Sequence, residues 1–299
     1  MSFGPLFIII AAILWSIDGV LRISLYSLPP AVIVFYEHLL GLLVLLFFIP
    51  KWIGELKKMT RKEWIAIMIV SLFSGALGTI LYTAALQKTN FLQYSVVVLL
   101  QQQLQPLWAI LVASLLLKEK LTKKFALWAL VALVAAYFVT FKDGTVNFST
   151  GNGTIIAGLL AVGAGFMWGS TTAISKFTLN KVSHIAATVL RFFFAPIFAL
   201  MFIIPLNQTS ALFQLTQQQW LTLLLITFST GMVAIVIYYY GLKKVQAKAS
   251  AIYELAFPAM AVMIDFFYYH KTLTLTQILG IAVLVYAMFQ VMKVTKRTS

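Results

Sequence analysis

The sequence of 299 residues contains no cysteine and little acidic charge, with eight Asp and Glu against 22 Lys and Arg. The lack of cysteine excludes disulfides, thiolate metal ligands and a thiol nucleophile. Charged residues make up only 10% of the chain, whereas soluble domains carry about 25%. No glycine-rich phosphate loop, metal-ligand spacing or nucleophile elbow is present. The sequence therefore indicates no cofactor, no metal and no enzymatic site.

Hydrophobic sequence fills the chain instead, at 62% of the residues and a mean hydropathy of +0.96. This excess is too large for a globular core and indicates a multi-pass membrane protein. Ten segments are long enough to cross roughly 30 Å of hydrocarbon. They cover residues 3–26, 31–50, 64–86, 91–117, 124–141, 154–176, 184–205, 220–242, 248–269 and 274–293. The short connections leave no room for a soluble domain.

Lys and Arg at the ends of these segments predict the orientation in the membrane. The loops on one side hold 17 of them, and the opposite loops hold only Lys88, Lys142 and Lys271. Because basic loops stay in the cytoplasm, both termini are expected there. The net charge of +14 thus reflects topology rather than nucleic-acid binding, and the expected location is the plasma (inner) membrane.

The two halves of the chain contain similar segments in the same order. "SGALGTILYTAALQKT" (74–89) matches "TGMVAIVIYYYGLKKV" (230–245) in Gly, Tyr, Leu and Lys, and Trp15 matches Trp168. We therefore predict two repeats of five helices each, residues 1–150 and 151–299. Five is odd, so the second repeat crosses the membrane in the opposite sense. Inverted repeats are typical of transporters, whose substrate site lies near the midplane.

The sequence resembles the drug/metabolite transporter superfamily, in particular its EamA family, over essentially the whole chain. The resemblance rests on these repeats, on Trp64 and Trp220 before the third and eighth helices, and on Pro106 and Pro258. Pro106 begins the segment that closes with "EKLT", and the segment after Pro258 closes with a relative of it, in which Lys271 replaces the usual glutamate. The resemblance implies an all-α membrane protein with ten transmembrane helices in two inverted five-helix repeats around a central cavity.

Residues 101–106, "QQQLQP", interrupt an otherwise apolar segment. Helical spacing places Gln101, Gln105 and Trp108 on one face, whereas Gln103 points roughly the other way. Polar, proline-broken helices are tolerated in a membrane where they line a water-filled cavity. The first face is therefore predicted to line a substrate passage, and Gln103 to bond a neighbouring helix.

Carboxylates inside the spans are functional candidates, because a charge at such depth is costly. Glu254 corresponds to Gln102 in the repeat, and it is predicted to bind either the substrate or a coupling proton. Asp265 lies nearer the exterior on the same face, where it suits a gate or a structural pair. Asp18 and Arg22 are four residues apart, a spacing that allows an ion pair.

Aromatic residues that match across the repeats are predicted to wall the cavity. The complete set of predicted substrate-binding residues is Trp15, Asp18, Tyr82, Gln101, Gln102, Gln105, Trp108, Trp168, Tyr238 and Glu254. Gating or proton coupling is predicted for Arg22, Glu254 and Asp265. Glu37 and Arg191 occupy matching positions in the second and seventh helices, where structural pairing at the flank of the site is expected.

These features favour a secondary transporter for a small polar metabolite, an amino acid or a related compound, with export as the expected direction. Its expected partners are this small-molecule substrate and the lipid bilayer, with a proton as the candidate coupling ion. An organic anion such as a sugar phosphate or nucleotide sugar, and a cationic amine, are the alternative substrates. A membrane-embedded enzyme or structural protein is the alternative outside transport.

Overall fold

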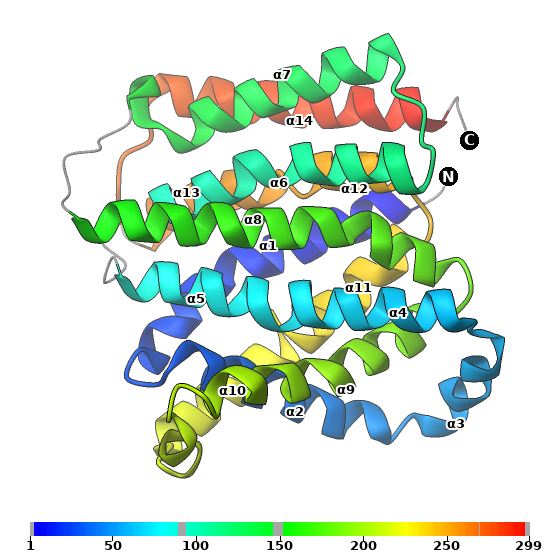
Figure 1. Ribbon diagram of the computed structural model, residues 1–299. Helices are drawn as coiled ribbons and strands as arrows, with labels where there is room; N and C mark the ends of the chain where they lie inside the picture. The colour runs from blue at the N-terminus through cyan, green and yellow to red at the C-terminus, as the bar shows by residue number, and fades with distance from the viewer. Residues whose placement is uncertain (1–2, 89–93, 146–151, 269, 297–299) are drawn as a thin grey trace.

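The protein is an all-helical bundle, as expected (Figure 1). The computed structural model describes residues 3–88, 94–145, 152–268 and 270–296, and no strand occurs among them. In these ranges eight helices are long and apolar enough to cross a membrane, and two shorter apolar helices, Pro30–Leu46 and Gln103–Leu116, accompany them. Together they make up the ten spans that the sequence predicts.

The elements of the two halves follow one another in the same order. The spans of the first half are α1 (Gly4–Leu21) with η1 (Arg22–Leu25), α2 (Pro30–Leu46), α4 (Arg61–Val70) with η3 (Ser71–Leu77) and α5 (Gly78–Lys88), α6 (Tyr94–Leu116) and α7 (Lys123–Thr140). Those of the second half are α8 (Asn152–Leu179), α9 (His184–Ile203), α10 (Gln217–Phe228) with α11 (Met232–Leu242), α12 (Ala247–Tyr253) with α13 (Ala256–Phe267), and α14 (Leu275–Lys296). The connections contain the short elements α3 (Ile49–Trp52), η2 (Ile53–Lys58), η4 (Lys142–Gly144) and η5 (Thr209–Phe213).

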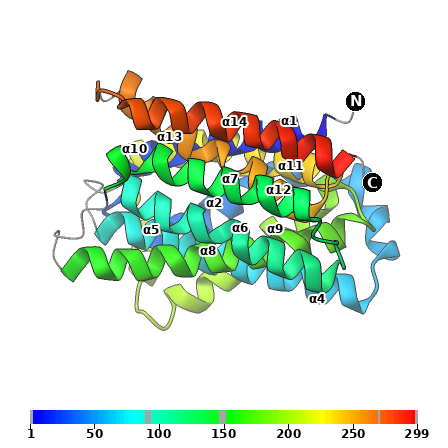
Figure 2. The same cartoon turned by 90° about the horizontal axis from the view of Figure 1, so that it is seen from above.

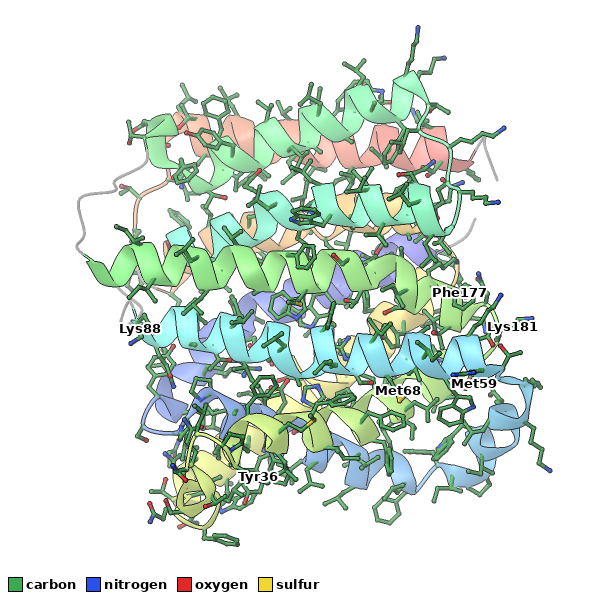
Figure 3. The ribbon with its side chains drawn as sticks, in the orientation of Figure 1. Tyr36, Met59, Met68, Lys88, Phe177 and Lys181 are labelled. Atoms are coloured by element: carbon green, nitrogen blue, oxygen red, sulfur yellow. The ribbon has the colours of Figure 1, made fainter. Side chains whose placement is uncertain are left out.

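Equivalent helices of the two halves run in opposite directions. In Figure 1, α1 and α7 run away from the end of the bundle where both termini lie, and α8 and α14 run towards it. The basic loops gather at the end with the termini. Figure 3 labels Lys181 at that end and Lys88 at the other. The chain thus has the geometry of an inverted repeat.

The packing of the helices has an approximate two-fold relation. Two contacts join equivalent helices, α2 with α9 and α7 with α14, and the second pair lies side by side in Figure 2. Other contacts between the repeats occur in equivalent pairs. The contact of α6 with α8 corresponds to that of α13 with α1, and the contact of α5 with α8 corresponds to that of α11 with α1. The first and sixth helices, α1 and α8, are therefore each enclosed by helices of the opposite repeat.

Close contact between helices depends on small side chains, as is usual in membranes. A Cβ atom added to Gly169 of α8 would lie 2.3 Å from the backbone oxygen of Gln105 in α6. One added to Gly241 of α11 would lie 2.8 Å from the backbone oxygen of Gly4 in α1. Glycine thus permits both of these inter-repeat contacts.

The third helix of each repeat begins with the same local motif. Thr60 and Thr216 occupy the N-cap positions of α4 and α10, and each is followed three residues later by Glu63 or Gln219. In both helices the N-cap hydroxyl accepts from a backbone N–H of the first turn, and the later side chain accepts from the N-cap backbone N–H at 2.8 Å. These capping boxes fix where the helices start, directly before the paired tryptophans.

Three of the predicted spans are interrupted within their length. Seven residues of the third span, Ser71–Leu77, form a π-helix, and the eighth span breaks between Phe228 and Met232. The ninth breaks at Glu254, because Pro258 has no N–H to donate and its ring crowds the carbonyl four residues earlier. The sequence predicted spans 220–242 and 248–269, which correspond to Gln217–Leu242 and Ala247–Phe267, and the structure adds the breaks inside them.

Glu119, in the loop after α6, joins the two repeats at the end that holds the termini. Its carboxylate accepts hydrogen bonds from the backbone N–H groups of Ala247 and Lys248, at 2.7 and 3.0 Å, in the first turn of α12. Lys248 in turn donates through Nζ to the backbone carbonyl of Lys120. A carboxylate at a helix N-terminus satisfies free backbone donors and favours the helix dipole. This bond therefore fastens α6 to α12 at one end.

Replacing Glu119 with Ala should destabilise the protein by about 1–2 kcal/mol, as the loss of an N-cap does. Thermal unfolding of the purified protein in detergent measures this. Lys120→Ala is the matched control, because Lys120 contacts Lys248 through its backbone carbonyl, which the substitution keeps. Equal melting temperatures for Glu119→Ala and the control would show that the bond does not hold the helices together.

Candidate functional site

A cavity of about 100 Å³ lies between the two repeats. Most of its lining consists of positions that correspond across the repeats, 152–156 residues apart. Pairs with polar or aromatic members in the lining include Trp15 with Trp168, Asp18 with Thr171, Arg22 with Ser175, Glu37 with Arg191, Ser74 with Thr230, and Tyr82 with Tyr238. The same backbone framework is thus used twice around one cavity, with different chemistry in each half.

Aromatic side chains form two opposed pairs in the lining. Trp15 lies against Tyr238 with ring centroids 5.1 Å apart, and Tyr82 lies against Trp168 at 5.2 Å. Each pair joins the tryptophan of one repeat to the tyrosine of the other. Tilted rings at this spacing pack favourably, so the two pairs form aromatic parts of the cavity wall.

The backbone carbonyl of Ser74 gathers three donors at the π-helix of the third span. Trp168 Nε1, Thr79 Oγ1 and Arg191 Nη2 each donate to it at 3.1 Å. A π-helix displaces carbonyls from the usual helical bonding, and such segments are frequent at functional sites. In the second repeat the corresponding residue, Thr230, lies in the break after α10 and donates to Asp18 at 2.6 Å.

Arg22 is the centre of an ion-pair cluster between α1 and α2. Its Nε bonds Asp18, one helical turn earlier, and its Nη2 lies 2.7 Å from Glu37 Oε2. All three side chains are at least 90% buried. The predicted pair of Asp18 and Arg22 is present. Glu37 forms a structural pair as expected, here with Arg22, but it lies in the cavity wall and not at the flank.

Glu254 lies at the break between α12 and α13 and is 3% exposed. Its Oε2 accepts from Gln105 Nε2 at 2.6 Å. Its Oε1 accepts from Tyr238 at 2.8 Å and from Ser250 at 2.9 Å. Three donors therefore surround this carboxylate, and two of them belong to residues that line the cavity.

The structure brings most of the predicted site residues together. The predicted residues that line the cavity are Trp15, Asp18, Arg22, Tyr82, Gln105, Trp168, Tyr238 and Glu254. The side chains of Gln101 and Gln102 lie outside the described residues. Gln103 faces α7, with its amide placed to bond the backbone of Leu133 and Tyr137 at 3.2 and 3.0 Å once the amide is oriented to satisfy both groups.

Two predicted residues lie elsewhere. Trp108 packs edge-on against Phe166 of α8, at 4.9 Å, and does not line the cavity. Asp265 pairs with Lys271 at 3.1 Å near the end of α13, where the lysine side chain is 63% exposed. The sequence predicted too wide a lining face in both helices. In α6 the cavity meets Gln105 but not Trp108, and α13 continues beyond the cavity before it reaches Asp265.

Several lining residues were not predicted, among them His38, Ser74, Thr171, Ser175 and Thr230, and Arg191, which was expected at the flank of the site, lines the cavity. His38 donates through Nδ1–H to the backbone carbonyl of Val34 at 3.0 Å, and its ring lies against Phe192. Thr171 and Ser175 occupy the positions in the second repeat that correspond to Asp18 and Arg22, and this correspondence would have indicated them. Neutral hydroxyl residues in apolar helices carry little signal of their own.

Comparison with known proteins identifies the family. The model of the EamA-like transporter family matches the chain twice, over residues 2–141 and 155–292. The chain belongs to the EamA-like transporter family. The two matches correspond to the two five-helix halves of this EamA protein.

Curated relatives of this EamA protein are transporters. The chain is 32% identical to the riboflavin transporter ImpX of Fusobacterium nucleatum over 292 residues, which cover 97% of each chain. It is 30% identical to an uncharacterized transporter of Synechocystis over 159 residues, covering 51% of this chain and 43% of that protein. A solved crystal structure, 16% identical and covering 99% of this chain and 98% of that chain, matches with a TM-score of 0.73, which shows the shared fold.

Cysteine substitution tests which face of α6 meets the cavity. Because the natural chain has no cysteine, a single Gln105→Cys gives an unambiguous signal with a water-soluble thiol reagent. We expect Gln105→Cys to be modified and Gln103→Cys, which faces α7, to be protected. The measurement is the labelled fraction by mass spectrometry in membranes. Equal labelling at both positions would contradict the assignment of the faces.

Proposed function

We propose that this EamA-family transporter carries a flat heteroaromatic metabolite that also bears hydroxyl groups, with riboflavin as the first candidate. The observation that carries the proposal is the double Trp–Tyr wall of the cavity, Trp15 with Tyr238 and Trp168 with Tyr82. An isoalloxazine ring offers a face for stacking and a polar edge, and its ribityl chain offers hydroxyls. The similarity to a riboflavin transporter along almost the whole chain supports the same substrate class.

An amino acid, the expectation from sequence, is the second candidate. It is favoured by one observation: Glu254 and Arg191 bring opposite charges to the same cavity. A zwitterion can place its ammonium group near Glu254 and its carboxylate near Arg191. Export remains the predicted direction from the family resemblance.

Transport requires the bundle to change shape. The cavity of this conformation measures about 100 Å³, less than the roughly 300–1,000 Å³ of typical small-molecule sites. A solute as large as a flavin therefore enters only after helices separate. Rocking of one inverted repeat against the other provides this opening.

The orientation and the division of the chain are part of the proposal. We place the protein in the plasma (inner) membrane with both termini in the cytoplasm, supported by the basic loops at the end where the termini lie. We divide the repeats at about residue 150, between the two family matches.

Purified protein in liposomes tests the substrate. We expect saturable uptake of labelled riboflavin that empty liposomes lack and that unlabelled riboflavin suppresses. Trp15→Ala should weaken the apparent affinity at least fivefold, because stacking of a flat ring on an aromatic side chain is worth about 1–3 kcal/mol. The matched control is Trp108→Ala, which removes a tryptophan that does not line the cavity. Uptake of amino acids with no response to riboflavin would favour the second candidate, and uptake of neither would reject both.

Glu254 is the proposed site of proton coupling, because a carboxylate surrounded by donors in the cavity can hold either a proton or a solute. Glu254→Gln keeps the shape and removes the exchangeable proton. We expect this variant to exchange substrate across the membrane but to lose its response to an imposed pH gradient. If the response survives unchanged, Glu254 does not carry the proton. A loss of substrate binding itself would assign it to the solute instead.

A further inference from the structure

Arg191 differs from the other charged residues of the cavity in its partners. It is 6% exposed, it lines the cavity, and it forms no ion pair with a carboxylate among the described residues. Its Nη2 donates to the carbonyl of Ser74 at 3.1 Å and its Nη1 to the hydroxyl of Tyr239 at 3.4 Å. Nε has no hydrogen-bond partner in the part of the chain that the structure describes. A buried guanidinium without a counter-ion is costly in a membrane and is a functional candidate.

The acids of the cavity are already occupied by other groups. Glu37, the repeat counterpart of Arg191, lies 2.7 Å from Arg22. Asp18 also bonds Arg22 and accepts from Thr230. The carboxylate of Glu254 is surrounded by three neutral donors. None of these contacts involves Arg191, so its charge has no partner within the cavity as described.

The repeat explains how this imbalance arises. The first repeat carries Asp18 and Arg22 in α1, and the second carries Thr171 and Ser175 at the corresponding positions of α8. Glu37 is therefore paired with Arg22 of its own repeat, whereas Arg191 has only hydroxyl residues at the equivalent positions of its repeat. Its Cγ lies 3.7 Å from the position of a Cβ added at Gly75, within the same π-helix that supplies the carbonyl of Ser74.

We infer that Arg191 binds the substrate through an oxygen acceptor on a planar group, either a ring carbonyl or a carboxylate. This inference rests on the proposed function of the central cavity. The carbonyl of Ser74 and the hydroxyl of Tyr239 hold Nη2 and Nη1, and Nε–H, which has no partner among the described residues, is the donor left for a ligand. A guanidinium held in this way recognises oxygen atoms by direction as well as by charge. Oxygen acceptors of this kind are the carbonyl groups at the imide edge of a flavin and the carboxylate oxygens of an amino acid.

The role of Arg191 is tested with pairs of ligands that differ only in the oxygen group proposed to accept its hydrogen bond. We expect wild-type protein to bind riboflavin about ten- to a hundredfold more tightly than an analogue with sulfur in place of both ring carbonyl oxygens, and to prefer tryptophan over tryptamine if amino acids are its substrates. Arg191→Met should reduce this ratio to near one. Arg191→Lys, which keeps the charge and loses the planar fork, should give an intermediate ratio. Arg61→Met, a change at an exposed arginine outside the cavity, should leave the ratio unchanged.

Stability separates this role from a structural one. If Arg191 only supports the carbonyl of Ser74, Arg191→Met should lower the melting temperature and weaken both members of each ligand pair equally, which would overturn the inference. If it is a ligand anchor, the melting temperature should be kept or raised, because an unneutralised buried charge has been removed.

A third measurement does not depend on the proposed substrate. Potassium formate should stabilise the wild-type protein against heat more than potassium chloride at the same ionic strength, and this difference should vanish in Arg191→Met. If formate acts on the wild type but no flavin or amino acid binds, the proposed substrates fail and the anchor stands. If formate has no effect and the ligand ratio is insensitive to Arg191, the anchor is rejected.

Discussion

A charge buried in a membrane bundle needs a partner, and this constraint organises the centre of the protein. Arg22 is partnered by two carboxylates, Asp18 one helical turn earlier and Glu37 of α2. Glu254 is partnered by three hydrogen-bond donors contributed by α6, α11 and α12. These contacts tie together helices from both repeats, so the polar groups that line the cavity also determine how the helices pack. Arg191 is the buried charge for which a bound ligand can supply the missing partner.

Interruptions of the helices make these contacts possible. The π-helix at Ser74 frees a carbonyl that three donors share, and the break at Thr230 turns a hydroxyl towards Asp18. Pro258 sets the break at Glu254 in the ninth span. All three interruptions border the cavity, where irregular backbone is tolerated because protein or water surrounds it. The irregular backbone of these three spans is therefore placed at the cavity.

The inverted repeat supplies symmetry of backbone without symmetry of chemistry. Both repeats place a tryptophan, a tyrosine and a broken third helix around the cavity. The first repeat adds an acid–base cluster, and the second adds Arg191 with hydroxyl groups. Membership of the EamA-like family accounts for the shared framework, and the asymmetric charges are what a substrate can distinguish. Substrate choice within such a family thus depends on a few side chains that the framework does not determine.

The sequence by itself determined the ten spans, their inversion and the aromatic walls, because hydrophobic length and repeated spacing are local properties that survive without coordinates. It also indicated Glu254 and the pair of Asp18 and Arg22, since a carboxylate in an apolar span and an i, i+4 spacing can be read directly. Only the tertiary structure decided that Glu37 joins that pair, that Arg191 forms no ion pair with a carboxylate in the described part of the chain and that Trp108 does not line the cavity. Periodicity groups residues on one face of a helix. Which part of that face meets the cavity depends on how each helix packs against its neighbours.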